Sequence, residues 1–185
     1  MKNNLLAIAL LVFVLSACGP AADVGESLPT LMPDMPGQAQ APEPSYLEIS
    51  GQVQTAAVGS YCWDYTDENG KPVGGACKDS IGISTPIESL PAERIITAQF
   101  SLPYATPPDR LSLHIFLASS ENEISLEEGA DLRLWGYTEG IIRQLDLQPR
   151  QQVKIELAPG LYVFSVSAGW DVKGEVMYGF LVEVK

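Results

Sequence analysis

Hydrophobic residues occupy alternate positions along several segments after residue 45, with polar residues between them. A period of two is typical of β-strands that bury one face. The alternating segments are 94–102, 110–118, 153–157, 162–170 and 176–184. Asp171 to Gly174 predicts a hairpin, while "STPIESLP" and "LPYATPPD" predict irregular connections. No helical stripe of useful length appears, so the pattern predicts an all-β fold: a single antiparallel β-sandwich, immunoglobulin-like or jelly-roll-like.

The stretch "LAPGLYVFSVSAGW" supports this fold class. It resembles the penultimate strands of bacterial immunoglobulin-like and related sandwich modules, in which Pro-Gly-x-Tyr opens an alternating strand. The resemblance covers about fourteen residues and implies a fold without implying an activity.

The N-terminus has a different pattern, in which Lys2 precedes a continuous apolar run from Leu5 to Leu15. These eleven residues are fewer than the ~20 that a membrane-spanning helix needs, and they match a secretory signal peptide. The tetrapeptide "LSAC" at 15–18 then closely resembles the lipobox of bacterial lipoproteins, a family in which diacylglycerol is attached to the cysteine and the signal is cut before it. The resemblance implies that Cys18 carries several acyl chains, which anchor a protein stably.

This N-terminus divides the chain into a signal peptide (1–17), a lipidated cysteine with its tether (18–45) and a β-sandwich domain (46–185). Six prolines and little periodicity between Gly19 and Ser45 predict disorder, and at ~3.1 Å per residue the tether reaches on the order of 80 Å. We expect an extracytoplasmic protein anchored to the cell membrane. Gly19 replaces the Asp that retains many lipoproteins of diderm bacteria at the inner membrane, which favours the outer membrane where the host has one. An ordinary secreted protein or an uncleaved anchor is the alternative.

Two further cysteines, Cys62 and Cys77, flank Asn69-Gly70, a strong hairpin signal. Each cysteine lies seven residues from this turn, so a hairpin here places them opposite each other at bridging distance. In an oxidising compartment a disulfide is favoured, and closing this loop is worth roughly 3 kcal/mol. Zinc would need four ligands, a redox enzyme would more often show C-x-x-C, and "DYTDENG" fails as an EF-hand loop. We therefore predict a disulfide, no metal site and no cofactor.

Acidic residues outnumber basic ones. The chain has 11 Lys and Arg and 23 Asp and Glu. Removal of the signal peptide, which contains Lys2, leaves a net charge of 10 − 23 = −13. Such a surface repels nucleic acid and anionic lipid headgroups, so neither is an expected partner. Solubility near an anionic envelope is the simplest interpretation, with a basic partner or divalent cations as the alternative.

Catalytic signatures are missing from the sequence. The single histidine, His114 in "SLHIF", is predicted on the strand face opposite Leu113 and Ile115, where a structural role is the simplest interpretation. There is no G-x-S-x-G, phosphate loop or dinucleotide fingerprint. We therefore expect a non-catalytic binding or assembly module. The alternative is an envelope hydrolase, for example glycan-directed, that uses paired carboxylates on either side of a cleft.

Two acidic loops, 64–71 and 119–131, are the predicted binding surfaces, because loops vary without disturbing a β scaffold. Aromatic residues beside them raise the hypothesis of a platform for an envelope protein or polymer, and core packing is the competing interpretation. The candidate ligand-binding residues are Trp63, Asp64, Asp67, Glu68, Glu121, Glu123, Glu127, Glu128 and Trp135.

Overall fold

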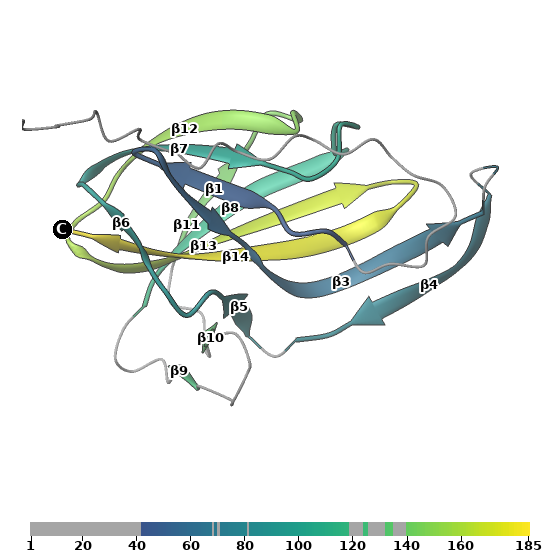
Figure 1. Ribbon diagram of the computed structural model, residues 1–185, viewed down its shortest axis with the longest axis horizontal. Helices are drawn as coiled ribbons and strands as arrows, with labels where there is room; N and C mark the ends of the chain where they lie inside the picture. Colours follow the sequence, from purple (N-terminus) through teal and green to yellow (C-terminus); the bar gives the residue numbers. More distant parts are fainter. Residues whose placement is uncertain are drawn as a thin grey trace, which may run out of the picture.

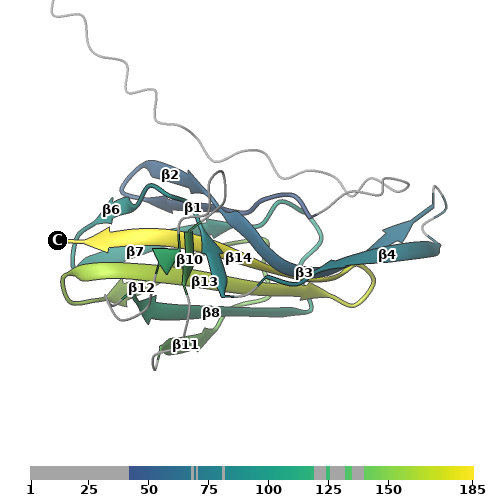
Figure 2. The ribbon, with the colours of Figure 1, turned by 90° about the horizontal axis from the view of Figure 1, so that it is seen from below.

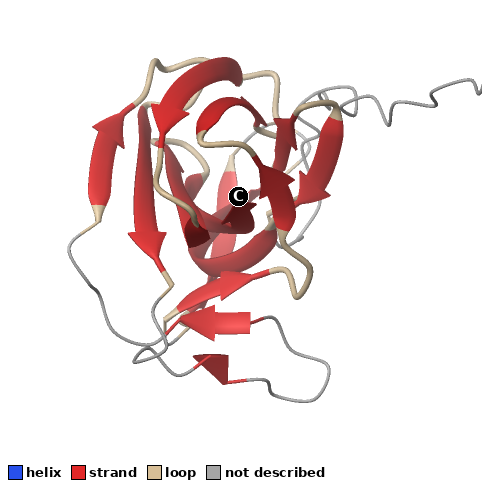
Figure 3. Cartoon of the chain, turned by 90° about the vertical axis from the view of Figure 1, so that its left-hand side faces the viewer, coloured by secondary structure: helices blue, strands red, loops and turns tan. Residues whose placement is uncertain are grey.

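The alternating segments form the strands of a two-sheet sandwich in the computed structural model, which describes residues 42–67, 69, 71–80, 82–118, 124–125, 132–134 and 140–185 (Figure 1). Within these ranges the regular structure is entirely β-strand, as the coloured cartoon in Figure 3 shows. It follows that this part of the chain contains no helix that is long and apolar enough to span a bilayer.

The sandwich consists of a large sheet and a small sheet. In spatial order, the large sheet contains β11 (Ile141–Gln144), β8 (Arg110–Leu117), β13 (Gly160–Trp170), β14 (Gly174–Val184), β3 (Ala57–Thr66) and β4 (Pro72–Lys78). The small sheet contains β12 (Arg150–Glu156), β7 (Ile95–Ser101), β1 (Tyr46–Ile49) and β2 (Gln52–Thr55). Pairing in both is antiparallel, except that β6 (Leu90–Ala92) pairs parallel with the end of β14. A third sheet of short strands contains β5 (Ile83–Thr85), β10 (Leu132–Leu134) and β9 (Ile124–Ser125).

The strand predictions are confirmed for β7, β8, β12, β13 and β14, each of which lies within or overlaps an alternating segment. The predicted hairpin at 171–174 is also confirmed, because Trp170 of β13 pairs with Gly174 of β14 across this turn. The proline-rich segment "STPIESLP" is only partly a connection. Its ends contribute to the three-residue strands β5 and β6, which are too short to produce an alternation in the sequence.

The main core lies between the large and small sheets. It consists of the inward-facing residues of the alternating strands. Leu111, Leu113 and Ile115 of β8 are all at most 3 % exposed and face the small sheet. From the small sheet, Phe100 meets Phe180 of β14 edge-on, with ring centroids 6.0 Å apart. Burying one face of each strand in this way supplies the main stabilisation of a sandwich.

The strand pair β3–β4 extends beyond the other strands at one end of the molecule (Figures 1 and 2). Among the described strands, β4 pairs only with β3, and most of its described side chains are exposed, including Val73 at 64 %. The Asn69 turn is held by the Asp67 carboxylate, whose Oδ1 accepts hydrogen bonds from the backbone N–H groups of Asn69 and Lys71. We call this strand pair the arm. Its outer strand, β4, depends on hydrogen bonds to β3 and on the covalent link described below, because most of its described side chains are exposed.

The packed chain begins before β1, within the 18–45 range that the sequence assigns to the tether. The Ser45 hydroxyl is buried and donates to the carbonyl of Ser101 at 2.9 Å. At Glu43 the backbone N–H donates to the Tyr104 hydroxyl at 3.1 Å, and its carbonyl accepts from the Tyr178 hydroxyl at 3.1 Å. Two core tyrosines thus fasten the chain where it enters the domain.

The ionisation of Tyr178 allows its hydrogen bond to Glu43 to be tested through protein stability at alkaline pH. Burial raises the pKa of its phenol well above 10, and the nearby Tyr104 and Glu43 charges act in the same direction. Its stabilising effect is complete below the unfolded-state pKa of about 10 and is lost as the pH rises toward the folded-state pKa, since only the unfolded chain then releases the proton readily. We expect Tyr178→Phe to flatten the fall in unfolding free energy above about pH 10, where one such group contributes up to roughly 1.4 kcal/mol per pH unit.

Urea unfolding at a series of pH values measures this slope. At neutral pH the variant should lose about 1 kcal/mol, because the Glu43 carbonyl loses its hydrogen-bond donor. Equal alkaline slopes for the two proteins would contradict the assignment.

Candidate functional site

The outward face of the large sheet is divided into a covered half and an open half. In the covered half, β5 lies directly on β14: an added Cβ at Gly179 would overlap the backbone carbonyl of Ser84, so only glycine permits this close approach. Ile83 of β5 packs there with Val163 and Leu181 of the large sheet, forming a second, smaller core with Phe116. The third sheet thus covers one end of the outward face.

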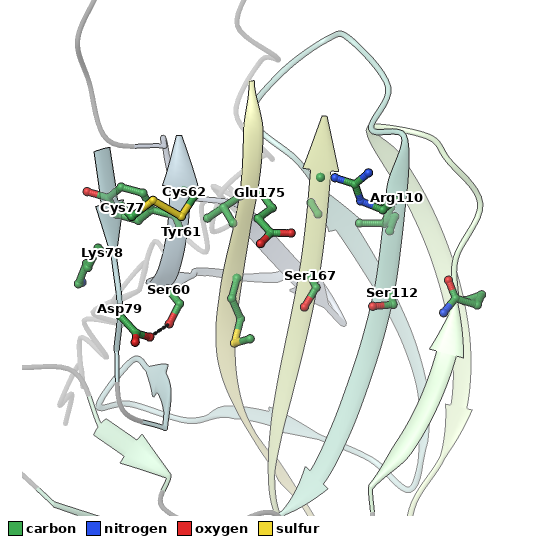
Figure 4. A pocket seen from close by; sticks show the side chains of 16 residues that line it. Ser60, Tyr61, Cys62, Cys77, Lys78, Asp79, Arg110, Ser112, Ser167 and Glu175 are labelled. Atoms are coloured by element: carbon green, nitrogen blue, oxygen red, sulfur yellow. Dashed lines mark hydrogen bonds between the residues drawn. A yellow bond between two sulfur atoms is a disulfide. The ribbon is translucent and has the colours of Figure 1, made fainter. Parts of the chain in front are cut away.

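In the open half there is a hollow of about 740 Å³ that we call the outer groove (Figure 4). It crosses the large sheet from β4 to β11, and its wall and floor residues come from β4, β3, β14, β13, β8 and β11. Its size is within the roughly 300–1,000 Å³ range of sites that enclose a small organic ligand. The outer groove is the candidate functional site.

Short side chains form the floor of the outer groove. Ser167 of β13 lies directly opposite Ser112 of β8, and both are half-buried. The next cross-strand pair is Gly169 with Arg110, and the guanidinium lies over the glycine, 3.0 Å from where a Cβ would be. Arg110 also forms an exposed ion pair with Asp171 at 3.0 Å. Small residues at the centre and long residues at the margin therefore create the hollow.

The Cys62–Cys77 disulfide lies at the β3–β4 side of the groove and confirms the sequence prediction. The two cysteines are directly opposite in the register of β3 and β4, with Cα atoms 4.0 Å apart. Figure 4 shows the bridge beside Lys78 and Asp79. The Ser60 hydroxyl contacts the Asp79 carboxylate at 3.5 Å, and Lys78 Nζ donates to the Val58 carbonyl at 3.2 Å.

Ser60 reaches the groove because β3 contains a bulge. Three residue steps from Val58 to Tyr61 on β3 face two steps from Tyr178 to Val176 on β14, so β3 carries one extra residue here. Val58 and Tyr61 both pack against the core, which leaves Ser60 to turn outward beside Met177. Bulges commonly redirect a side chain in this way next to a site.

Several polar groups of the groove have no partner among the described residues. They are the Glu175 carboxylate, the Ser167 hydroxyl and the Gln144 amide, for which neither hydrogen bond nor ion pair is found in this part of the chain. Glu175 lies on β14 between Cys62 and Gly169, near the middle of the groove (Figure 4). Polar groups held open in a concave surface are available to a ligand.

His114 faces outward, as predicted, next to this floor. Its Nε2 is hydrogen-bonded to the Ser112 hydroxyl at 3.3 Å, and its ring lies 6.2 Å from that of Phe116. A serine nucleophile needs a base that is itself oriented by a third group. Within the described ranges no carboxylate accepts a hydrogen bond from this ring. The Ser112–His114 pair therefore has two of the three groups of a catalytic triad.

The residues predicted to bind a ligand either lie away from the outer groove or fall outside the described residues. Trp63 is 7 % exposed and stacks on Tyr104, with centroids 5.5 Å apart, so the platform hypothesis for Trp63 gives way to core packing. Asp64 is exposed on the arm, and Asp67 is occupied by the turn. Cys18, Glu68, Glu121, Glu123, Glu127, Glu128 and Trp135 lie outside the described residues, and most of the 119–131 loop does so with them.

Metal binding gains no support from the geometry: across the described ranges there is no cluster of three or more His, Cys, Asp or Glu side chains placed to hold an ion. A scan against protein-family models gives no match, and a search of curated proteins finds no significant relative.

The sequence contains a signal for the groove in addition to the alternation of apolar residues. The outward positions of β13 are Val163, Ser165, Ser167 and Gly169, which shorten along the strand. Small outward residues in a central strand indicate a depression in the sheet face. Strand order is needed to place Arg110, Glu175 and Lys78 around it, and the order β4-β3-β14-β13-β8 does not follow the sequence.

Proposed function

We propose that this protein is a lipid-anchored, extracytoplasmic binding module whose ligand occupies the outer groove. The binding half of the proposal is supported by three polar groups, Glu175, Ser167 and Gln144, that have no partner among the described residues and lie in a hollow of about 740 Å³ on the large sheet. Side chains on strands hold such groups more precisely than loops do. Binding is favoured over turnover because His114, the only histidine, has a serine partner and no orienting carboxylate within the described residues.

The anchoring half of the proposal comes from the "LSAC" tetrapeptide that ends at Cys18 and from the apolar run before it. A proline-rich tether then presents the domain away from the membrane, which suits capture of an envelope component. The groove takes the place of the two acidic loops as the proposed site, because the described part of the first loop uses Asp67 to hold its turn.

Cys18→Ala tests the anchor. We expect the variant to leave the membrane fraction and to appear as soluble extracytoplasmic protein or as an unprocessed precursor, since it lacks the acylated thiol. Fractionation followed by immunoblotting measures this, with Cys62→Ser/Cys77→Ser as the control that retains Cys18. Unchanged membrane fractionation of Cys18→Ala, together with processing of the wild type that is insensitive to globomycin, would contradict lipid attachment.

Ser167→Trp tests the groove, because an indole at the centre of the floor obstructs the hollow. The soluble Cys18→Ala chain is incubated with insoluble cell-wall polymer and, separately, with immobilised envelope extract. We expect Ser167→Trp to lower the bound fraction about tenfold, equivalent to roughly 1.4 kcal/mol. Gln152→Trp, an exposed position on β12 in the small sheet, is the matched control. Equal binding by both tryptophan variants would reject the groove as the site.

A further inference from the structure

We infer that the ligand of the outer groove is a linear, uncharged glycan that lies across the strands, with successive sugar rings over successive strands. This inference rests on the proposed function and specifies its ligand class. Three observations support it: the spacing of the groove's polar side chains, the charge balance of its walls and the kind of groups that are left unpartnered.

The floor presents one side chain from each of five neighbouring strands. The register pairs Gln144 with Ser112 and Ser112 with Ser167, and it continues from Ser167 to Met177, beside which the bulge places Ser60. Neighbouring strands lie about 4.8 Å apart, so this row repeats at that interval across the sheet. A ligand that runs along the groove therefore meets a new side chain at every strand.

A β-1,4-linked chain of sugar rings fits this repeat, because its rise per ring is close to the strand spacing. Successive rings are turned over, but hydroxyl groups lie on both edges of each ring, so every ring can hydrogen-bond to the strand beneath it. An extended peptide does not match it. Peptides rise about 3.3 Å per residue and present side chains to one face only at every second residue, at an interval of about 6.6 Å. A peptide lying across the strands would lose register with the row within a few residues, whereas a linear glycan keeps one ring for each strand.

The charges of the groove cancel although the chain as a whole is strongly acidic. Lys78 and Arg110 are balanced by Asp79 and Glu175, so 2 − 2 = 0, while the chain carries −12. Their order across the sheet is mixed, and no field of one sign extends along the hollow. A polyanion or polycation would meet as many repulsive as attractive groups, so an uncharged ligand fits the groove best.

The available groups also suit sugar hydroxyls. Glu175 and Gln144 have planar ends with two polar atoms side by side, which can hydrogen-bond to two neighbouring hydroxyls at once. Arg110 has a similar fork, of which one nitrogen is held by Asp171. Ser167 offers a donor and an acceptor between them. The half-buried Met177 and the exposed Cys62 and Cys77 provide apolar surface for the C–H groups of the rings.

Titration of the soluble Cys18→Ala chain with defined oligosaccharides tests the inference. The probes are the β-1,4-linked tetramers of glucose and of N-acetylglucosamine, together with their monomers and an uncharged hexapeptide of alanine and glycine. We expect a tetramer to bind at least about tenfold more tightly than its monomer, as calorimetry and amide chemical shifts of β8, β13 and β14 would show. Affinity should change less than about twofold between 50 and 500 mM salt, because an uncharged ligand makes no ion pair for salt to screen.

Two variants separate a groove effect from loss of folding. Ser167→Trp should abolish tetramer binding and Gln144→Ala should weaken it severalfold, while Gln152→Trp on the small sheet should bind as the parent does. Melting temperatures of all four proteins establish that they fold. Tighter binding of the hexapeptide than of either tetramer, or no saccharide binding by a folded chain, overturns the glycan inference. If envelope material still depends on Ser167 in that case, the proposed function stands with another ligand class; if it does not, both fail.

Discussion

Trp170→Ala is expected to lower the free energy of unfolding by about 3–5 kcal/mol, the usual cost of truncating a large aromatic residue in a core. Trp170 is 1 % exposed at the end of β13. Its ring meets Trp63 edge-on at 5.7 Å and Tyr104 edge-on at 5.6 Å, so the substitution leaves a cavity between two aromatic neighbours. The indole N–H also donates to the Thr106 carbonyl at 3.0 Å. A domain of this size has roughly 5–15 kcal/mol of stability, so the variant should be marginal.

Urea unfolding followed by far-ultraviolet circular dichroism measures this loss without depending on tryptophan emission. Trp170→Phe should cost clearly less than Trp170→Ala, because it retains most of the aromatic contact and loses only the indole N–H and some volume. Val172→Ala, two residues along and 69 % exposed, should change stability by less than about 0.5 kcal/mol. If Trp170→Ala and Val172→Ala are equally stable, the aromatic cluster does not support this end of the sandwich.

The strands that the sequence predicts well are those with long alternation. Segments such as 162–170 and 176–184 alternate over nine residues, and a one-residue slip would expose their whole apolar face. These segments therefore determine the register in which their strands pair. The same reasoning misses β5 and β6, because three residues are too few for a period and their burial comes from what packs on them. Ile83, for example, is buried by the large sheet's outward face.

The disulfide and the groove differ in how far apart their residues lie in the sequence. Cys62 and Cys77 belong to one hairpin, so a turn signal and residue counting are enough to pair them. Arg110 and Glu175 reach the same groove from β8 and β14, which are two places apart in the large sheet with β13 between them. Non-local strand order is not encoded in any one segment, so the composition of the groove is accessible only from the folded structure.

Trp63 shows why clustered aromatic and polar residues in a strand are a poor guide to a surface site. Trp63 and Asp64 are neighbours in the sequence, but successive residues of a strand point to opposite faces. Trp63 therefore enters the core while Asp64 faces solvent, and the two do not act together at a surface. The alternation of β3 predicts this separation once the strand is placed, whereas the clustering of polar and aromatic letters in "YCWDY" suggests the opposite.

Removing the disulfide with Cys62→Ser/Cys77→Ser is expected to destabilise the β3–β4 arm by about 3 kcal/mol in the chain-entropy model, because the bridge joins residues 15 apart in sequence. Most described side chains of β4 are exposed, and of the strands that the structure describes β4 pairs only with β3, so little burial opposes its separation once the bridge is absent. The loss should therefore appear mainly as local opening of the arm, with a smaller change in global unfolding.

Native-state hydrogen exchange resolves the two levels. In the double variant, amides of β4 should exchange on the order of a hundredfold faster, as about 3 kcal/mol implies, while amides of β13 and β14 should change much less. Ligand capture by the groove should fall as well, since Lys78 and Asp79 leave its wall when β4 opens. Uniform acceleration across all three strands would mean that the arm and the sandwich unfold as one unit. Unchanged exchange in β4 would show that the hydrogen bonds of the arm hold it without the covalent link.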